Sequence, residues 1–282
     1  MNVLDACRWA AEELGELESP RLEAELLLCH LMNWKRHELY LNHKCEIHES
    51  CLEQYRKTVR RRKNREPLQH ITRRVDFLGR SFIAGPGALI ARPETEFLSE
   101  LFMSELSEPG YILDAGTGSG VIAVSLALKY QAALVIGTDI SREAMILARM
   151  NKELFKVQNL MLVRTDLVET FRQGIRIFDG IIANLPYIPS AQIHDLEPEV
   201  RDGDPLIALD GGVNGLDLVL SLIDSVPGIL KIGGILALEL DHEQVETVSK
   251  ILEKNHLWID VNAFNDYAGQ PRVVTARIQG RT

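Results

Sequence analysis

The sequence predicts an α/β fold: a doubly wound, seven-stranded, Rossmann-like domain, preceded by a small helical bundle and a β-hairpin linker. Three observations predict it. From Tyr111 onward, short apolar runs alternate with helical patterns, and the first four runs are continuously apolar, as expected for parallel strands covered on both faces. A glycine-rich turn follows the first of these runs. The residues before about 73 show only the apolar spacing of helices.

The first domain is predicted over residues 1–73. Its apolar residues recur at helical spacing, and Ser19-Pro20 marks a helix start because Pro is tolerated at the first helical position. Short helices joined by short connections indicate a small bundle. The helices are expected over residues 3–17, 20–31, 36–41 and 50–64.

The last of these helices is strongly basic. Such a run is most often a solvated helix face. In a chain of formal net charge -9, the alternative interpretation is a docking surface for an acidic partner or for RNA. The cationic residues are Arg56, Lys57, Arg60, Arg61, Arg62, Lys63 and Arg65.

A linker is predicted over residues 74–90. Alternation from Val75 to Ile83 indicates a β-hairpin, and Gly85-Pro86-Gly87 is a break in regular structure. The second domain is predicted over residues 91–282 and opens with a helix from Pro93. Its strands are expected near 111–114, 134–139, 160–164, 177–183, 232–240, 257–263 and 271–278, and its helices near 119–130, 141–155, 214–226 and 242–254.

The composition is that of an ordinary globular protein, with 46% hydrophobic and 25% charged residues. The acidic net charge argues against binding driven by a large basic surface on nucleic acid. The chain shows no secretory leader and no apolar run long enough to cross a bilayer, so we expect a cytoplasmic protein with reduced thiols. The four cysteines match no common zinc-site spacing, so no metal is expected.

The glycine-rich turn follows the strand that ends near Asp114, and it predicts a cofactor site. Val121 stands where a dinucleotide fingerprint wants a small residue. The Asp114 carboxylate would repel a pyrophosphate but suits the cationic amino group of a methionine moiety, which favours S-adenosylmethionine. The candidate cofactor residues of the turn are Asp114, Gly116, Thr117, Gly118, Ser119 and Gly120.

Two further carboxylates follow the next two strands. Asp139 can accept both hydroxyls of a ribose. Asp166 would accept from the amino group of adenine, and Leu167 would cover the ring. Each Asp taken alone could be a helix N-cap. Their position at successive strand ends around one crevice favours a cofactor site instead.

The fourth strand ends at Asn184, where an apolar run meets a Pro-aromatic turn. If the sheet order reverses between the first and fourth strands, Asn184 lies opposite the glycine turn. Its Oδ1 and the carbonyl oxygen of Leu185 could hold both N–H groups of a planar amine, with Tyr187 packed on it. Asn184, Leu185, Pro186 and Tyr187 are therefore the candidate catalytic residues of an N-methyltransferase. In isolation, this motif would be an ordinary turn.

Several blocks of the sequence resemble those of the PrmC/HemK release-factor glutamine methyltransferases, and the resemblance covers nearly the whole chain. The Arg-Pro-Glu-Thr-Glu block is highly specific to that family, whereas Asn-x-Pro-Tyr is shared with amino-methyltransferases at large. The blocks are Arg65-Glu-Pro-Leu-Gln-His-Ile-Thr72, Leu89-Ile-Ala-Arg-Pro-Glu-Thr-Glu96, Asp114-Ala-Gly-Thr-Gly-Ser-Gly120, Asn184-Leu-Pro-Tyr187, Leu209-Asp-Gly-Gly212 with Gly215-Leu-Asp217, and Gly269-Gln-Pro-Arg272.

The resemblance implies N5-methylation of the glutamine in the Gly-Gly-Gln loop of bacterial peptide-chain release factors, which modulates translation termination. S-adenosylmethionine would be the donor and S-adenosylhomocysteine the product. The Asn184–Tyr187 motif would hold the glutamine, and the helical domain with its hairpin would dock the release factor. Arg92 and Glu94 are candidates for substrate contacts. This chain carries Leu185 where the family usually has Pro, and its Asn-Leu-Pro-Tyr also looks like the motif of rRNA adenine dimethyltransferases.

The loop over residues 188–212 is long enough to be a lid, and it is rich in acidic residues. We interpret it as part of the acceptor pocket that disfavours a polyanionic substrate. Three alternative functions remain open: an N6-adenine methyltransferase on RNA or DNA, a non-catalytic adaptor, and an NAD oxidoreductase. The acidic net charge and the absence of a separate target-recognition domain argue against the first, so we expect no nucleic acid as direct substrate.

Overall fold

The computed structural model describes residues 1–280 and divides into two compact units. The first comprises Met1–Arg74 together with the short segment Glu197–Gly203. The second comprises Val75–Leu196 and the chain from Asp204 onward. The chain therefore leaves the second unit within the loop over residues 188–212, joins the first for seven residues, and returns.

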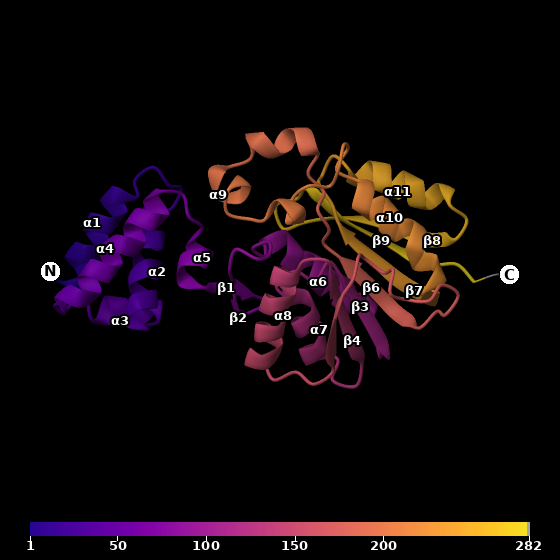
Figure 1. Cartoon of the computed structure of the whole chain (residues 1–282), viewed down its shortest axis with the longest axis horizontal. Coiled ribbons are helices and arrows are strands. Elements are labelled where there is room, and N and C mark those ends of the chain that lie inside the picture. The colour runs from indigo at the N-terminus through magenta and orange to yellow at the C-terminus, as the bar shows by residue number, and fades with distance from the viewer. Residues whose placement is uncertain (281–282) are drawn as a thin grey trace. The chain divides into compact units, whose positions relative to one another are not determined.

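The first unit is helical (Figure 1). All five helices contribute apolar side chains to its core, and the hydroxyl of buried Tyr55 donates to the carbonyl oxygen of Ala24 at 2.8 Å. The fifth helix lies beyond the four that the apolar spacing predicts. The helices are α1 (Val3–Glu13), α2 (Pro20–Met32), α3 (Arg36–Leu41), α4 (Glu49–Lys63) and α5 (Leu68–Thr72).

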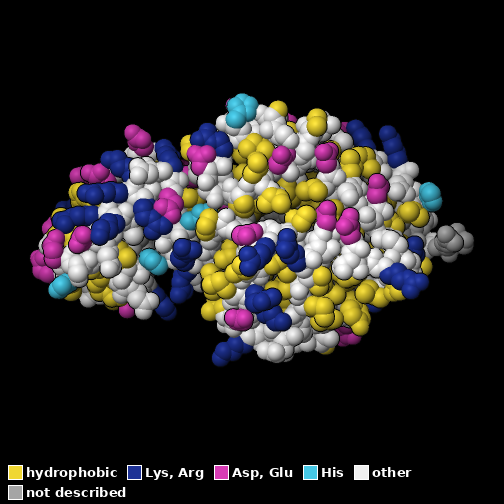
Figure 2. Space-filling model, viewed as in Figure 1, with side chains coloured by type: hydrophobic (Ala, Val, Ile, Leu, Met, Phe, Trp, Pro, Cys, Tyr) yellow, Lys and Arg dark blue, Asp and Glu magenta, His cyan; other side chains and the backbone are white. Residues whose placement is uncertain are grey.

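The basic run on α4 is largely neutralised by carboxylates of the same unit. Arg60, by contrast, is exposed and makes no ion pair within the described residues 1–280. Figure 2 accordingly shows cationic and acidic side chains mixed over this unit. The solvated, internally paired interpretation of the run is therefore favoured over a basic docking surface. The pairs are Arg56–Glu49, Lys57–Glu53, Arg61–Glu66, Arg62–Glu23, Arg62–Glu199, Lys63–Glu13 and Arg65–Glu199.

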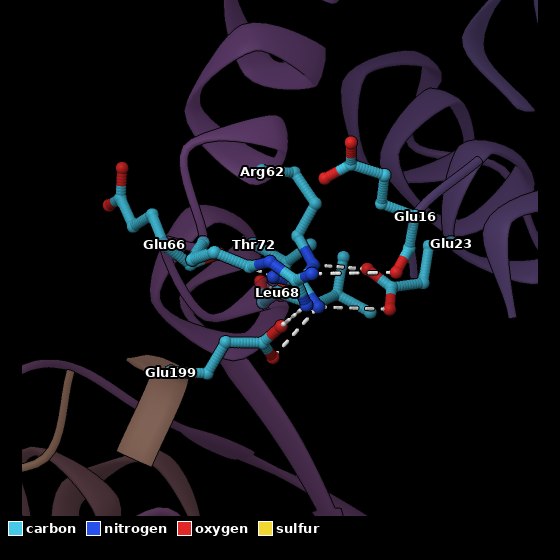
Figure 3. Close-up of polar contacts among 8 residues, drawn as sticks. Glu16, Glu23, Arg62, Glu66, Leu68, Thr72 and Glu199 are labelled. Carbon is cyan, nitrogen blue, oxygen red and sulfur yellow. Dashed lines mark hydrogen bonds and ion pairs between the residues drawn. The ribbon is translucent and has the colours of Figure 1, made fainter. Parts of the chain in front are cut away.

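Arg62 holds the segment Glu197–Gly203 within the first unit. Figure 3 shows its guanidinium between the carboxylates of Glu23 on α2 and Glu199 on α9 (Pro198–Arg201). The Arg62 Nη2 lies 3.1 Å from an oxygen of Glu23 and 2.8 Å from one of Glu199, and Arg62 is only 3% exposed. One buried cation thus compensates two carboxylates that are far apart in sequence.

Replacing Arg62 by Met is expected to destabilise the first unit by about 3 kcal/mol, because partly buried Glu23 loses its ion-pair partner and Glu199 keeps only Arg65. Amide hydrogen exchange of the full chain should become faster in α2, α4 and residues 197–203. Arg60→Met is the matched control, since it removes an exposed arginine from the same helix. Equal exchange rates in the two variants would contradict the role assigned to Arg62.

The second unit contains a hairpin, β1 (Arg74–Phe77, starting one residue before the unit) and β2 (Arg80–Ile83), and a seven-stranded sheet of order β5-β4-β3-β6-β7-β9-β8. All strand pairs from β5 to β7 are parallel, and β9 is antiparallel to both neighbours. The strands are β3 (Tyr111–Ala115), β4 (Leu134–Asp139), β5 (Leu160–Arg164), β6 (Phe178–Ala183), β7 (Leu230–Glu239), β8 (Trp258–Asn265) and β9 (Pro271–Ile278).

Helices cover both faces of this sheet, as predicted (Figure 1). Ile181 packs in the core that includes α10 and α11, whereas its neighbour Ile182 packs in the core that includes α6 and α7. From Gly180 to Ala183, β6 is therefore without polar side chains, because both of its faces are buried there. The helices are α6 (Pro93–Glu105), α7 (Val121–Lys129), α8 (Arg142–Leu154), α10 (Asp217–Ser225) and α11 (Val245–Lys254).

The predicted reversal of strand order between β3 and β6 is confirmed. Ala115 at the end of β3 is the register partner of Ala183 at the end of β6. Gly116 and Asn184 therefore follow side by side at the carboxyl edge of the sheet. No helix within residues 1–280 combines the length and the apolar character needed to cross a membrane.

Candidate active site

A cavity of about 200 Å³ lies in the second unit at the carboxyl ends of β3, β4 and β6. Its wall includes eight of the predicted site residues: Gly116, Gly118, Asp139, Asp166, Leu167, Asn184, Leu185 and Pro186. The wall also includes residues that were not predicted: Gly87, Ala88, Leu89, Ile140, Ser141, Ala144, Pro205, Ile207, Ala208 and Leu218. A crevice at the point where strand order reverses is where open α/β sheets bind ligands.

The glycine turn needs its glycines for two different reasons. Gly116, Gly118 and Gly120 all have positive φ, of 76°, 56° and 81°. At Gly116, a Cβ would also lie 2.7 Å from the Cδ2 of Leu185. The turn is therefore both left-handed and in close contact with the first residues after β6.

Asp139 fixes the turn from the end of β4. Its Oδ2 accepts a hydrogen bond from the Gly118 N–H at 2.9 Å, and its Oδ1 accepts from the Ser141 N–H at 2.8 Å. Burial raises the pKa of this carboxyl, and the backbone hydrogen bonds oppose that rise. Asp166 and Leu167, from the end of β5, complete this side of the wall.

Asp114 lies behind the wall and is completely buried. Its Oδ2 accepts from the Thr117 hydroxyl at 2.6 Å and from the Ala123 N–H at 3.1 Å, while its Oδ1 has no hydrogen-bond partner among the described residues. Burial raises the pKa of Asp114 to about 7. Of the other predicted residues of the turn, Thr117, Ser119 and Gly120 are also buried and lie off the wall.

The buried Asp114 makes stability depend on pH. Its folded pKa of about 7 lies above the usual unfolded value of about 3.9. The folded chain therefore retains a proton between these values, so this contribution to stability is present below about pH 4 and lost as the pH rises through about 7. We expect Asp114→Asn to gain stability relative to the unsubstituted chain as the pH is raised from about 5 to about 8. Urea unfolding of the ligand-free proteins measures this, and a pH-independent difference would refute it.

The nitrogen and the oxygen of the Asn184 side-chain amide have different surroundings. Its Nδ2 donates to the hydroxyl of Thr95 at 2.9 Å. Its Oδ1 is buried and has no hydrogen-bond partner among residues 1–280. Because buried polar atoms are normally paired, this free acceptor on a cavity wall indicates a site for a donor from a ligand.

Tyr187 is the last residue of the Asn184–Tyr187 motif and is half-buried. Burial raises the pKa of its hydroxyl. Its backbone carbonyl accepts from the side-chain amide of Gln244 at 2.8 Å, which anchors the end of the motif. Tyr187 is not part of the cavity wall.

Arg92 and Glu94 also lie off the cavity wall. Arg92 pairs with Asp204 at 3.0 Å, and the same carboxylate accepts from the Ile90 N–H at 3.1 Å. Asp204 is buried, so this contact fixes the loop that returns to the second unit. Asp204 and two other acidic residues of this loop, Glu199 and Asp202, are paired with arginines. The interpretation of the loop as a free acidic surface that repels polyanions is therefore weakened.

Two family models match the chain. One, described as PrmC N-terminal domain, matches residues 5–72, and one described as methyltransferase small domain matches residues 83–196. The release factor glutamine methyltransferase of Geobacter sulfurreducens is 38% identical over 277 residues, which cover 98% of this chain and 96% of that protein. The protein of the same name from Bacillus subtilis is 33% identical over 283 residues, covering 98% of both chains.

Solved methyltransferase structures share the fold of the second unit. A ribosomal protein L11 methylase from Lactobacillus delbrueckii superposes with a TM-score of 0.52 at 24% identity, covering 70% of this chain and 84% of that one. A methyltransferase from Pyrococcus furiosus superposes with a TM-score of 0.52 at 21% identity, covering 72% and 91%. At these identities the likeness shows the fold alone.

Proposed function

The chain belongs to the family of release factor glutamine methyltransferases, and we propose that it transfers a methyl group from S-adenosylmethionine to the side-chain amide nitrogen of the glutamine in the Gly-Gly-Gln motif of peptide-chain release factors. The observation that carries the proposal is the unpartnered, buried Oδ1 of Asn184 on the cavity wall. The relatives named for this activity supply the substrate class.

The residues of the cavity fit the proposed donor. Gly116 and Gly118 present backbone without side chains to the cavity, and Asp139 offers acceptor oxygens for a ribose. Asp166 and Leu167 offer a polar and an apolar contact for adenine. Asp114, through its unpartnered Oδ1, is the proposed partner of the cationic amino group. S-adenosylmethionine supplies a methyl group on a sulfonium, which is a good leaving group.

The acceptor side must overcome the weak nucleophilicity of an amide. Its nitrogen lone pair is delocalised into the carbonyl, and no ordinary side-chain base deprotonates it outright. We assign to Asn184 Oδ1 and the Leu185 carbonyl oxygen the task of accepting both N–H groups, which turns the lone pair toward the methyl carbon. Pro186 on the wall and Tyr187 behind it are assigned to confine the planar group. The sulfonium departs as a neutral thioether, and the methylated nitrogen releases one of its two protons to water. Catalysis is then positioning and electrostatic preorganisation.

The remaining assignments concern recognition of the protein substrate. We assign docking of the release factor to the helical domain of residues 1–73 with the hairpin of residues 74–90, and methyl transfer to residues 91–282. Glu94 and Arg92 are assigned to binding of the protein substrate. Arg92 would act through its ion pair with Asp204. A cytoplasmic location belongs to the same proposal, because the substrate acts in translation.

The competing function is N6-adenine methylation of RNA or DNA, which the Asn-Leu-Pro-Tyr motif leaves open. Incubating the full chain with methyl-labelled S-adenosylmethionine, release factor, total RNA and DNA separates the two. We expect the label in the release factor only. Label in nucleic acid and none in protein would overturn the proposal.

A further inference from the structure

We propose that Thr95 and Glu239 are positioning residues that set the direction of the Asn184 side-chain amide, so that its Oδ1 rather than its Nδ2 faces the acceptor nitrogen. The inference rests on the proposed methyl transfer at Asn184 and deepens it. Thr95 belongs to the Arg-Pro-Glu-Thr-Glu block, for which the cavity wall itself offers no role.

Thr95 is a fixed partner for Asn184. It lies in the first turn of α6 and is 3% exposed, and its backbone N–H and carbonyl are both engaged, the N–H with the Arg92 carbonyl at 3.1 Å and the carbonyl with the Ser99 hydroxyl at 2.8 Å. Its Oγ1 accepts from Asn184 Nδ2 at 2.9 Å. A hydroxyl carries one hydrogen to donate, so Thr95 must direct that hydrogen elsewhere.

Glu239 is the proposed acceptor for the hydrogen of the Thr95 hydroxyl. It is the last residue of β7, and its predecessor Leu238 is the register partner of Ala183, so Glu239 follows beside Asn184. It is 1% exposed, and the side chains of Thr95 and Asn184 favour the ionised form of its carboxyl by lowering its pKa. An ionised carboxylate only accepts, so the Thr95 hydroxyl donates to it and keeps a lone pair for Asn184.

The pKa of Glu239 is raised to about 7, mainly by burial. Glu94 acts in the same direction, and Arg272 opposes the rise. The side chains of Thr95 and Asn184 also lower the pKa, because they stabilise the ionised form. Its Oε2 has no hydrogen-bond partner among the described residues, so the contacts with the neighbouring side chains are what hold this carboxyl in a direction.

In the proposed arrangement the hydrogen bonds run in one direction: Asn184 donates to Thr95, and Thr95 donates to Glu239. An amide can rotate by half a turn with almost no change in shape, because its oxygen and nitrogen are nearly the same size. In the rotated form, an N–H group would face the N–H groups of the substrate glutamine and hold neither. A carboxylate at position 239 excludes the rotated form. The Thr95 hydroxyl gives its hydrogen to the carboxylate, so it can only accept from Asn184, and the Asn184 Nδ2 must face it.

The test uses the full chain with a release factor substrate. Thr95→Val keeps the shape but removes the hydroxyl, and it is expected to lower kcat by about 10- to 100-fold while cofactor affinity stays within about threefold. Thr95→Ser restores the hydroxyl and should return kcat to within about threefold of the unsubstituted chain. Thr275→Val, a matched change at a buried threonine of β9, is the control and should leave kcat unchanged.

Glu239→Gln tests the polarity itself. The glutamine amide can donate to Thr95, which frees the hydroxyl hydrogen to bond Asn184 Oδ1 in its place. We expect kcat to fall by about 10-fold or more, although shape and volume are kept. Solvent exchange of the Asn184 amide hydrogens, followed by NMR, should become faster in Thr95→Val and stay slow in Thr95→Ser.

Unchanged kcat in both Thr95→Val and Glu239→Gln would overturn the inference, as would a failure of Thr95→Ser to restore activity. Asn184→Ala is assayed beside these variants. If it loses activity while the Thr95 and Glu239 variants do not, the proposed function stands and only the positioning roles fail. If Asn184→Ala is fully active, the proposed function fails first.

Discussion

Asn184→Ala is expected to lower the rate of methyl transfer by about 10²- to 10³-fold, the usual cost of removing one preorganised hydrogen-bonding group from a transition state. The substitution removes the unpartnered Oδ1 on the cavity wall and with it one of the two proposed holds on the acceptor amide. Affinity for S-adenosylmethionine should change little, since Asn184 is one of many contacts around the cavity.

Single-turnover kinetics and calorimetry with the same protein separate these two quantities. Asn262→Ala is a suitable control, because Asn262 is an exposed residue of the edge strand β8. A loss of cofactor affinity equal to the loss of turnover would assign Asn184 to cofactor binding instead. Full activity would remove it from the catalytic residues.

Gly116→Ala is expected to reduce methyl transfer by about 100-fold, because the new methyl group disturbs both halves of the site at once. The backbone at Gly116 is left-handed, and a Cβ there would lie 2.7 Å from the Leu185 Cδ2 and 3.7 Å from the Asn184 carbonyl oxygen. Leu185 must therefore move, and its carbonyl is the second proposed acceptor. Since Gly116 also lines the cavity, cofactor affinity should fall by about 10-fold.

Gly174→Ala isolates the effect of the contact. Gly174 also has positive φ, of 89°, but a Cβ there meets nothing within 4 Å. Both variants carry the same left-handed strain of about 1 kcal/mol, and Gly116→Ala adds the clash with Leu185, so Gly116→Ala should lose more stability in urea unfolding. Only Gly116→Ala should lose transfer. Equal activity in the two variants would show that the contact with Leu185 does not matter.

Much of the fold could be predicted because its strands are apolar on both faces. The run from Gly180 to Ala183 is an example: it has no polar side chain, which favours a strand buried on both faces, and its end is marked by Asn184. The helix over Leu68–Thr72 was not predicted, because Pro67 indicates only where the previous helix ends. The segment Glu197–Gly203 joins the first unit through ion pairs of Glu199 with Arg62 and Arg65, and no local sequence pattern predicts such distant contacts.

In the site, too, some residues could be predicted from the local sequence pattern and others could not. Gly116, Asp139 and Asn184 could be predicted as wall residues because each lies at or directly after the end of a strand, and parallel strands end at one edge. The contacts of Thr95 with Asn184 and Glu239 link three elements that are distant in sequence. No spacing rule brings such residues together, so only the folded chain reveals them.

Mass spectrometry of the release factors from cells with and without this protein tests the central claim most directly. The account predicts one added methyl group, on the glutamine of the Gly-Gly-Gln motif, in cells that contain the protein. It predicts loss of that methyl group when the protein is deleted, and its return with the unsubstituted chain but not with Asn184→Ala. An unmodified glutamine in cells that contain the active protein, or a methyl group that persists after deletion, would contradict the account.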